Sequence, residues 1–277
     1  QMCIRDRNNL FDLTGKTALI TGAGGLLGPK HAEAIVEFGG EVILTDHHKD
    51  RVQAKAMMIN EKYGRECAFP YYMDVTDKET IEDVVSQVPQ IDILINNAAK
   101  DPKVKKEAGL TPDSRFETMT EDYWFEGIDA ALNGTFFCSQ VVGNKMLGQG
   151  GGVILNISSD LGVIAPDQRL YRKDGIPENA QNVKPITYSA AKWAIVGMTK
   201  YLAVYFAKKN IRVNCLSPTG VYNNHPEEFV SKLSNIIPMG RMAHIDEYKG
   251  AVVFLCSDAS TYMTGENLVI DGGKSVW

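Results

Sequence analysis

Several features that would point to other classes of protein are missing from this sequence. No apolar run approaches the roughly 20 residues that a membrane-spanning helix needs, and the first residues contain no apolar signal core. The net charge of -5 gives no general reason to expect nucleic acid or a membrane surface as a partner. These absences predict a protein that binds neither nucleic acid nor membrane.

Cysteine is also scarce, and its spacing excludes a disulfide framework. There is no C-x-x-C pair, and no histidines stand at metal-ligand spacing beside a cysteine. The five cysteines lie far apart, at Cys3, Cys67, Cys138, Cys215 and Cys256. This pattern is typical of reduced thiols in a cytoplasmic protein, and we expect no metal site.

What the sequence does contain is the composition of an ordinary globular protein. Of its 277 residues, 44% are hydrophobic and 23% charged, which is enough for a sizeable core. The opening stretch "QMCIRDRNN" is charged, aperiodic and lacks an initial Met. We interpret residues 1–9 as a non-native or disordered remnant and expect residues 10–277 to form a single domain.

Short β-branched runs alternate with longer amphipathic segments along the chain. The runs indicate strands at 16–21, 41–46, 67–74, 91–96, 152–158, 211–217 and 267–271. Helices are expected at 27–38, 50–62, 78–87, 121–147, 187–209 and 245–257, with a short helical lid at 226–236. This alternation predicts an α/β fold: a doubly wound parallel sheet, or Rossmann fold, of about seven strands with helices on both faces.

Two connections are longer than usual for such a fold. Residues 100–118 follow the fourth expected strand and residues 160–186 follow the fifth, and both contain Pro and Gly. Open α/β sheets bind ligands outside the carboxyl ends of their strands. We therefore expect these two segments to form the walls of a substrate site.

The glycine-rich stretch "TGAGGLLG" stands between the first expected strand and the first expected helix. It fits a T-G-x-x-G-x-x-G spacing, with Gly22, Gly25 and Gly28 in place. Glycines there let the backbone approach a pyrophosphate, whose charge the helix amino terminus favours. The placement predicts a dinucleotide site, with Leu27 near the cofactor.

The alternative spacing T-G-x-x-x-G-x-G puts Leu26 where a glycine belongs. We expect Leu26 to lie beside the pyrophosphate in a backbone conformation that is open to a residue with a Cβ. The tight turn is then expected at Gly24 and Gly25.

Asp46 ends the second expected strand, eighteen residues beyond Gly28. A carboxylate there would accept hydrogen bonds from the adenosine ribose and repel a 2'-phosphate, so NAD is expected in preference to NADP. His47, His48 and Lys49 follow and would partly offset that repulsion.

The stretch "YSAAK" places Tyr188 and Lys192 four residues apart, on one face of an expected helix. A nearby ammonium favours the phenolate and lowers the pKa of a tyrosine, as proton transfer near neutral pH requires. Ser159 lies at the carboxyl end of the fifth expected strand, on the sheet edge that the start of this helix faces. Ser158 would point to the opposite side, toward the core or the cofactor.

These motifs occur in an order that resembles the short-chain dehydrogenase/reductase family from about Gly15 to the end of the chain. The matching pieces are the glycine turn, Asp46, "DVT" at 74–76, "NNAA" at 96–99, "NISS" at 156–159, "YSAAK" at 188–192, "SPTG" at 217–220 and "YMTGENLVIDGG" at 262–273. The resemblance implies an oxidoreductase that moves a hydride between a nicotinamide cofactor and a carbon bearing a hydroxyl or carbonyl.

The resemblance also implies roles for particular residues. Tyr188 would donate or accept the proton, Lys192 would bind the nicotinamide ribose and lower the Tyr188 pKa, and Ser159 would hydrogen-bond the reacting oxygen. The remaining cofactor contacts would come from Asp74 and Val75 at the adenine, Asn97, Ala98 and Ala99 at the adenosine ribose, and Pro218, Gly220 and Val221 at the carboxamide. Tyr188 and Lys192 belong to the cofactor set as well.

Three positions besides Leu26 depart from the family pattern. Ala131 replaces an asparagine that helps a proton relay, so another group or water must complete that path. Thr219 stands where a glycine is common, and Asn223 where a threonine is common. Ala131 supports one alternative, a non-catalytic NAD-binding sensor or subunit, which the retained Ser159, Tyr188 and Lys192 oppose.

The glycine spacing suggests a further alternative, a sugar epimerase or dehydratase of the family's extended branch. Only about 55 residues follow "SPTG", too few for the substrate lobe of that branch, so the compact single-domain branch is favoured.

The long connections predict a small polar substrate. Arg169 and Tyr171, in "DQRLYRK", would suit a carboxylate or phosphate, and Lys103, Lys105 and Lys106 stand in the first connection. We predict a sugar-like or polyol substrate, with an acidic group as one option. A homodimer or homotetramer is implied by the resemblance, built on the helices at 121–147 and 187–209, with Cys138 facing the partner.

Overall fold

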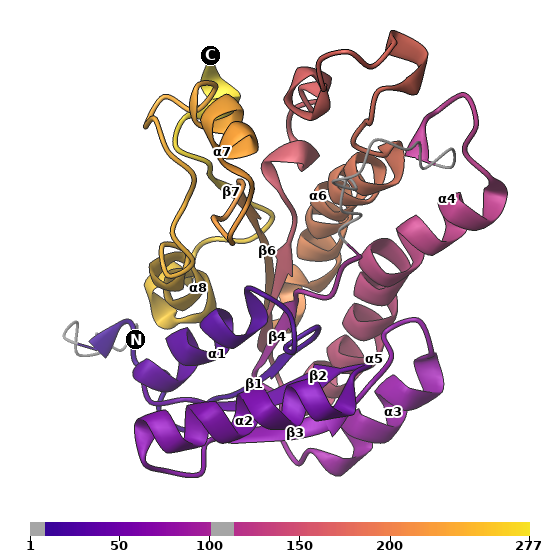
Figure 1. Cartoon of the computed structure of the whole chain (residues 1–277). Helices are drawn as coiled ribbons and strands as arrows, with labels where there is room; N and C mark the ends of the chain where they lie inside the picture. Colours follow the sequence, from indigo (N-terminus) through magenta and orange to yellow (C-terminus); the bar gives the residue numbers. More distant parts are fainter. Residues whose placement is uncertain (1–8, 101–113) are drawn as a thin grey trace.

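Seven apolar runs form one parallel sheet in the computed structural model, which describes residues 9–100 and 114–277 (Figure 1). The strands are β1 (Thr17–Ile20), β2 (Glu41–Asp46), β3 (Ala68–Tyr72), β4 (Ile93–Asn96), β5 (Gly152–Ile157), β6 (Ile211–Pro218) and β7 (Asn267–Ile270). Their order is β3-β2-β1-β4-β5-β6-β7, and each neighbouring pair is parallel. The predicted strands and fold class are confirmed.

Helices connect these strands and cover both faces of the sheet (Figure 1). They are α1 (Gly28–Glu37), α2 (Lys49–Tyr63), α3 (Lys78–Gln87), α4 (Glu121–Ile128), α5 (Gly134–Gln149), α6 (Ile186–Phe206), α7 (Glu227–Ser234) and α8 (Lys249–Cys256). Three short 3-10 turns matter for the site: η4 (Asp160–Gly162), η5 (Gln168–Tyr171) and η9 (Lys274–Val276). None of the helices in the described ranges is long and apolar enough to cross a membrane.

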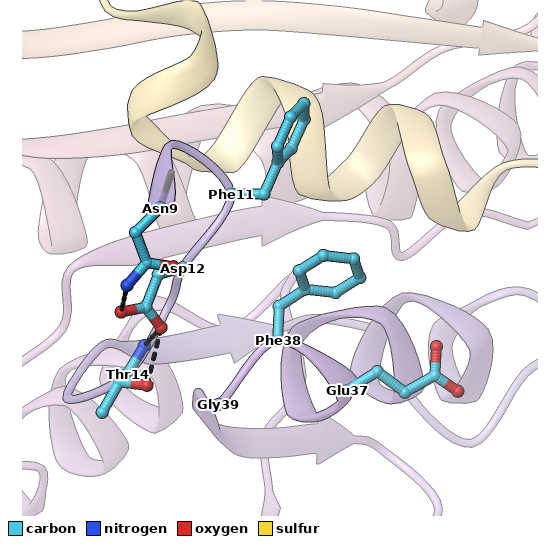
Figure 2. Close-up of a pocket in the computed structure, with 7 residues that line it drawn as sticks. All are labelled: Asn9, Phe11, Asp12, Thr14, Glu37, Phe38 and Gly39. Atoms are coloured by element: carbon cyan, nitrogen blue, oxygen red, sulfur yellow. Dashed lines mark hydrogen bonds between the residues drawn. The ribbon is translucent and has the colours of Figure 1, made fainter. Parts of the chain in front are cut away.

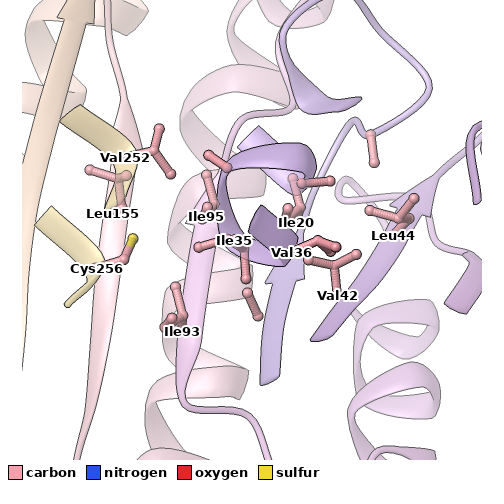
Figure 3. Close-up of a cluster of buried hydrophobic side chains, with 14 of the residues drawn as sticks. Ile20, Ile35, Val36, Val42, Leu44, Ile93, Ile95, Leu155, Val252 and Cys256 are labelled. Carbon is pink, nitrogen blue, oxygen red and sulfur yellow. The ribbon is translucent and has the colours of Figure 1, made fainter. Parts of the chain in front are cut away.

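Alternating side chains along each strand divide the core into two layers. Ile20 of β1 packs with α1, α2 and α8 on one face, as Figure 3 shows for Ile35 and Val252. Leu19, the neighbouring residue, packs with α3, α5 and α6 on the other face. Cys138 belongs to this second layer and is fully buried against the sheet, so the expectation that it faces a partner subunit is wrong.

The four described cysteines, Cys67, Cys138, Cys215 and Cys256, are all buried and form no disulfide. Burial raises the pKa of Cys138 and of Cys256 to about 12, so these thiols stay protonated.

The helix expected over 121–147 is interrupted. A π-helical turn, η3 (Asp129–Asn133), separates α4 from α5. Within it the Asn133 side chain donates a hydrogen bond to Asp129 Oδ1 at 2.8 Å. The apolar pattern continues through the wide turn, which is why the sequence predicts one continuous helix.

The direction of the winding reverses beside β1. The chain runs from β1 outward to β2 and β3, then returns to place β4 on the other side of β1. The connections that leave β1 and β4 therefore diverge, and open α/β sheets bind ligands at such a point.

A surface pocket of about 450 Å³ lies at the opposite edge of the sheet (Figure 2). Two segments line it: Asn9, Phe11, Asp12 and Thr14, which precede β1, and Glu37, Phe38 and Gly39, which precede β2. Asp12 accepts hydrogen bonds from Asn9 and Thr14 there. The proposed remnant at 1–9 stays a prediction, because residues 1–8 lie outside the described residues.

His31 is a buried polar residue of α1 with an expected effect on stability. It is 1% exposed, and neither ring nitrogen meets hydrogen-bond geometry. Burial lowers its pKa to about 4, and the nearby Asn97 side chain opposes this shift only in part. In the unfolded chain His31 binds a proton near the ordinary histidine pKa of 6.5, so stability from the neutral ring is lost as pH falls from 6.5 toward 4.

We expect this loss to reach about 3 kcal/mol in the free energy of unfolding. Urea unfolding at pH 7 and pH 4, at one protein concentration, measures it. His31→Leu should remove that part of the loss, whereas His244→Leu, at a side chain 70% exposed, should behave as wild type. If the free energy of unfolding fell by the same amount between pH 7 and pH 4 in wild type and in His31→Leu, the expectation would be contradicted.

Candidate active site

The glycine-rich turn after β1 is shaped by Gly22. Gly22 has φ +62°, and a Cβ there would come within 2.7 Å of the Ala98 Cα. The turn is closed by a hydrogen bond from the Gly25 N–H to the Gly22 carbonyl at 3.1 Å. Gly24 and Gly25 have no positive φ. The tight turn therefore includes Gly24 and Gly25, where it was expected, and its left-handed residue is Gly22.

Leu26, Leu27 and Gly28 lead into α1. Leu26 is 40% exposed and has no positive φ, so its backbone is open to a residue with a Cβ, as expected. A Cβ at Gly28 would lie 2.6 Å from the Ala23 Cα, which explains the glycine there. No side chain caps the amino terminus of α1, and the positive end of the helix suits an anion.

The connection after β4 is hydrogen-bonded to the glycine turn. The Asn97 and Ala98 N–H groups both donate to Thr21 Oγ1, at 3.0 and 2.9 Å. Asn97 Nδ2 donates to the carbonyls of Thr21 and Gly22, at 2.9 and 3.2 Å. The structure thus joins two motifs that are 76 residues apart in the chain, with Ala99 following directly.

Asp46 lies at the carboxyl end of β2 and faces the same turn. Its Oδ2 accepts a hydrogen bond from the Gly24 N–H at 3.0 Å, and its Oδ1 accepts one from the His48 N–H at 2.9 Å. The residue is 7% exposed. A Cβ at Gly24 would come within 3.0 Å of the Arg51 Cβ, so Arg51 of α2 stands beside the same loop. The sequence patterns did not single out Arg51.

Asp74 and Val75 follow β3. Asp74 Oδ1 accepts hydrogen bonds from the Thr76 N–H at 2.9 Å and the Thr76 hydroxyl at 2.7 Å. Val75 is buried against Gly134, at the start of α5. Both residues lie at the carboxyl edge of the sheet, beyond β2.

Lys192 joins α6 to the end of β5. The residue is 3% exposed, and its ammonium donates a hydrogen bond to the Ile157 carbonyl at 2.8 Å. The Ser158 hydroxyl donates to the Lys192 carbonyl at 2.8 Å, so Ser158 faces the core as expected. Lys192 Nζ lies 5.7 Å from the centroid of the Tyr188 ring. An ammonium this close favours the ionised phenol.

Ser159 follows Ser158 and is also buried. Its hydroxyl donates to Asp160 Oδ1 at 2.8 Å, and its Oγ accepts a hydrogen bond from the Leu161 N–H at 3.2 Å. Ser159, Tyr188 and Lys192 are therefore brought to one region by β5, η4 and α6.

A second lysine lies against the Tyr188 ring. Lys184 Nζ is 4.1 Å from the ring centroid, closer than Lys192. Gln168 holds the Lys184 backbone: its Oε1 accepts from the Lys184 N–H at 2.8 Å, and its Nε2 donates to the Lys184 carbonyl at 3.2 Å. The sequence showed Lys184 only as one of several loop charges, because nothing in its spacing points to Tyr188.

Pro218, Thr219, Gly220 and Val221 continue from β6. Val221 pairs with Ala243, and a Cβ at Gly220 would come within 2.7 Å of the Leu233 side chain of α7. The structure thus places this connection between the sheet edge and α7.

Arg169 and Tyr171, the two loop residues expected to bind substrate beside Ser159 and Tyr188, lie against other side chains. Arg169 pairs with Asp167 at 2.7 Å, and its side chain is 77% exposed. Tyr171 packs beside Phe229 of α7, with ring centroids 5.9 Å apart. Lys103, Lys105 and Lys106 lie outside the described residues.

The position of the family's relay asparagine is apolar. Ala131 is 3% exposed and packs with Ala191, Ile195 and Cys215. Asn133 is engaged with Asp129 in the π-helical turn, so it does not replace the missing amide. In the described part of the chain, no group of three or more metal-ligating side chains is arranged to hold a metal ion.

The residues at this edge fit a nicotinamide dinucleotide. The glycine turn and the uncapped amino terminus of α1 offer backbone N–H groups to a pyrophosphate. Asp46 places a buried carboxylate beside that turn, and Lys192 a buried ammonium beside a phenol. A doubly wound sheet that carries these groups at the carboxyl ends of its strands is typical of a dinucleotide-dependent oxidoreductase.

Comparisons with known proteins identify the family. The sequence matches the short chain dehydrogenase model over residues 16–171 and the enoyl-(acyl carrier protein) reductase model over residues 175–275. The chain belongs to the short-chain dehydrogenase/reductase family, and it is an oxidoreductase that acts on CH–OH groups.

Relatives align over nearly their whole length. An NAD-dependent glycerol dehydrogenase of Listeria innocua is 35% identical over 275 residues, 96% of each chain. A D-threitol dehydrogenase of Mycolicibacterium smegmatis is 32% identical over 96% of this chain and 95% of its own. A crystal structure of a gluconate 5-dehydrogenase from Burkholderia cenocepacia, in complex with NADP and tartrate, superposes with a TM-score of 0.82 at 26% identity, covering 97% and 98% of the two chains.

Proposed function

We propose that this protein oxidises a secondary hydroxyl of a small polyhydroxylated substrate, or reduces the matching ketone, with NAD(H) as cofactor. The observation that carries the proposal is the buried Lys192 ammonium. It is bonded to the last residue of β5, two residues before Ser159, and it faces the Tyr188 ring.

The proposed chemistry assigns one task to each side chain. When bound, the nicotinamide accepts or supplies a hydride. Tyr188, as phenolate, takes the proton of the reacting hydroxyl, and Lys192 stabilises that phenolate while its fixed position orients the ring. Ser159 contacts the substrate from the end of β5. The burial of Ser159 and Lys192 excludes water from this side of the site.

The proposed cofactor contacts follow the same edge of the sheet. The pyrophosphate would lie on Gly22, Gly25, Leu27 and Gly28, the adenosine on Asp46, Asp74, Val75, Asn97, Ala98 and Ala99, and the carboxamide on Pro218, Gly220 and Val221. The preference for NAD over NADP rests on Asp46, whose buried carboxylate would repel a 2'-phosphate. Relatives and neighbours include both an NAD-dependent enzyme and an NADP complex.

The proposed substrate class rests on charge and polarity around Tyr188. Lys184 adds a second ammonium at the reacting phenol, which suits a sugar acid. Hydrogen bonds between polar residues stabilise the segment 160–186. For example, Gln181 Nε2 donates to the carbonyls of Lys173 and Ile176. The similar enzymes are named as dehydrogenases of glycerol, threitol and gluconate.

A substrate panel tests this proposal. With NAD⁺ and equal concentrations of glycerol, threitol, gluconate, cyclohexanol and a 3-hydroxyacyl thioester, we expect the fastest NADH formation from the polyols or the sugar acid. The margin over cyclohexanol should be at least about tenfold, since each unsatisfied polar group in a site costs about this much. Turnover confined to cyclohexanol or the thioester would overturn the substrate assignment and leave the reaction type standing.

We further propose a homodimer or homotetramer in the cytoplasm. Large side chains stand exposed on α5 and α6, including Phe136, Trp193, Tyr201 and Val204. Exposed side chains of this size are typical of an interface between subunits, and light scattering of the purified protein measures the mass directly. Four unpaired, buried thiols fit a reducing compartment.

A further inference from the structure

Lys184 lies closer to the Tyr188 ring than Lys192 does. Its Nζ is 4.1 Å from the ring centroid, whereas Lys192 Nζ, bonded to the Ile157 carbonyl, is at 5.7 Å. Lys184 and Tyr188 are both half-buried, so water and salt screen this contact only in part. One phenol therefore interacts with two ammonium groups, one from its own helix and one from the connection before that helix.

Several contacts hold Lys184 in this place. Gln168 of η5 binds both polar groups of the Lys184 backbone, accepting from the N–H at 2.8 Å and donating to the carbonyl at 3.2 Å. Pro185, the next residue, is buried and has extended backbone angles at the start of α6. Because its backbone is fixed, the Lys184 side chain starts from a defined point beside Tyr188.

An ammonium at the face of a phenol distinguishes the two protonation states of the ring. The face of the neutral ring carries only the weak negative charge of its π electrons. The phenolate carries a full negative charge that is spread over its oxygen and its ring, so the ammonium attracts it more strongly. The contact with Lys184 therefore favours the ionised form of Tyr188.

Asp160 is the charged residue of η4, which packs against α6. It is 4% exposed, and its Oδ2 accepts a hydrogen bond from the Lys274 ammonium of η9 at 2.8 Å. The Thr219 hydroxyl donates to the same oxygen at 2.8 Å. The ion pair cancels most of the field of this carboxylate, so it opposes the two ammonium groups at Tyr188 only weakly.

Charges on the side of α4 are paired as well. Lys100 and Tyr123 line a small cavity with Thr187, the residue before Tyr188, where α4 packs against α6. Lys100 pairs with Glu126 of α4 at 2.6 Å, and a phenol such as that of Tyr123 adds no charge of its own at neutral pH. This leaves the two lysines at the Tyr188 ring as the main influence on its proton.

We propose that Lys184 acts together with Lys192 to keep Tyr188 as phenolate, so that the enzyme oxidises its substrate at a lower pH than Lys192 alone would allow. This inference rests on the proposed oxidation of a hydroxyl by Tyr188. Only the phenolate can take the proton of that hydroxyl, so its population sets the rate. Lys184 acts through Tyr188, and Gln168 acts through Lys184, so both are positioning residues.

The pH dependence of the rate tests this inference. For threitol, an uncharged substrate, kcat/KM with saturating NAD⁺ should rise with pH, and the midpoint of the rise should be about one pH unit higher in Lys184→Met. A unit charge at about 4 Å changes a proton equilibrium roughly fivefold in water-like surroundings, and more where water is partly excluded. Above both midpoints the two rates should agree within about twofold, because the variant then also holds Tyr188 as phenolate.

Further variants separate the charge of Lys184 from its packing. Lys184→Arg keeps the cation and should retain most of the wild-type pH profile. Gln168→Leu releases the Lys184 backbone and should raise the midpoint by about half a pH unit. Lys209→Met removes the cation that lies 4.1 Å from the Tyr205 ring centroid, which is the same change at a tyrosine with no proposed role, and should leave the profile unchanged.

The phenolate of Tyr188 can also be measured without a substrate. Its ultraviolet absorbance is the difference between a protein and the same protein with Tyr188→Phe, titrated over one pH range. The difference between wild type and Tyr188→Phe should have a midpoint about one pH unit lower than the difference between Lys184→Met and Lys184→Met/Tyr188→Phe. This second measurement does not depend on turnover.

The outcomes separate this inference from the proposed function. An unshifted midpoint in Lys184→Met, whether the loss of rate is equal at every pH or confined to KM for gluconate, overturns the role of Lys184 at Tyr188 and leaves polyol oxidation standing. Absence of turnover with every polyol of the panel overturns the proposed function, and the absorbance titration then decides the role of Lys184. If Lys184→Met fails to fold, the midpoint of Gln168→Leu decides.

Discussion

Tyr188→Phe is expected to lower kcat by about 10³-fold, with NADH affinity unchanged within about threefold. The substitution removes only the phenolic oxygen, which is the atom that takes or gives the proton. The ring is retained, and with it the contacts to Lys184 and Lys192 at 4.1 and 5.7 Å from the centroid. Steady-state rates with the best substrate of the panel, together with NADH fluorescence titration, measure both quantities.

The same helix supplies a matched control. Tyr205 lies 17 residues further along α6, and Lys209 Nζ is 4.1 Å from its ring centroid, as Lys184 Nζ is from Tyr188. Tyr205→Phe therefore repeats the chemical change under a similar cation, away from Ser159. We expect its kcat to stay within about twofold of wild type. Retention of activity by Tyr188→Phe would remove Tyr188 from the mechanism.

The seven strands could be predicted because burial on both faces demands nearly continuous apolar runs. β4, with the sequence "ILIN", is fully buried, as such a run requires. The π-helical turn at Asp129–Asn133 could not be predicted in this way, because the wide turn leaves the hydrophobic pattern of the helix intact. Local composition therefore predicts the strands, but it does not predict the interruption of the helix.

In the candidate site too, residues close in the sequence could be paired from their spacing, whereas residues far apart could not. Tyr188 and Lys192 could be paired because helical spacing alone puts them on one face. Asp160 and Lys274 are 114 residues apart, and only the completed sheet brings η9 beside η4. Arg169 shows the reverse case: its forked donors suggested an anion, but a carboxylate two residues away, Asp167, takes them.

The glycine turn shows that residue spacing can locate a turn without giving the backbone conformation of each residue in it. The spacing of Gly22, Gly25 and Gly28 predicted the turn between β1 and α1. It did not show which glycine adopts positive φ, because the close approach to Gly22 comes from Ala98, which belongs to a distant connection. Leu26 is tolerated since the strained position lies four residues before it.

Asp46→Asn is expected to change the preference between NADH and NADPH by about 100-fold in favour of NADPH. The asparagine keeps the size of the side chain and an acceptor for the Gly24 N–H, but it removes the charge that would repel a 2'-phosphate. Arg51, His47 and His48 stand close to this position, so positive charge is available once the carboxylate is gone. Fluorescence titration of wild type and variant with each cofactor gives the ratio of the two Kd values.

The ratio of the Kd values for NADH and NADPH distinguishes the effect of the Asp46 charge from the effect of its hydrogen bonds to the turn. If Asp46 acted only by anchoring Gly24 and His48, its loss would weaken both cofactors equally and leave the ratio unchanged. Asp92 provides the control, since it also accepts a hydrogen bond from a backbone N–H, that of Thr17 at 3.0 Å, and pairs with Lys16, but at the amino end of β1. Asp92→Asn should alter stability and not the ratio. Because only repulsion between the carboxylate and the 2'-phosphate distinguishes the two cofactors at this point, tighter binding of NADPH by wild type would refute the assignment of NAD.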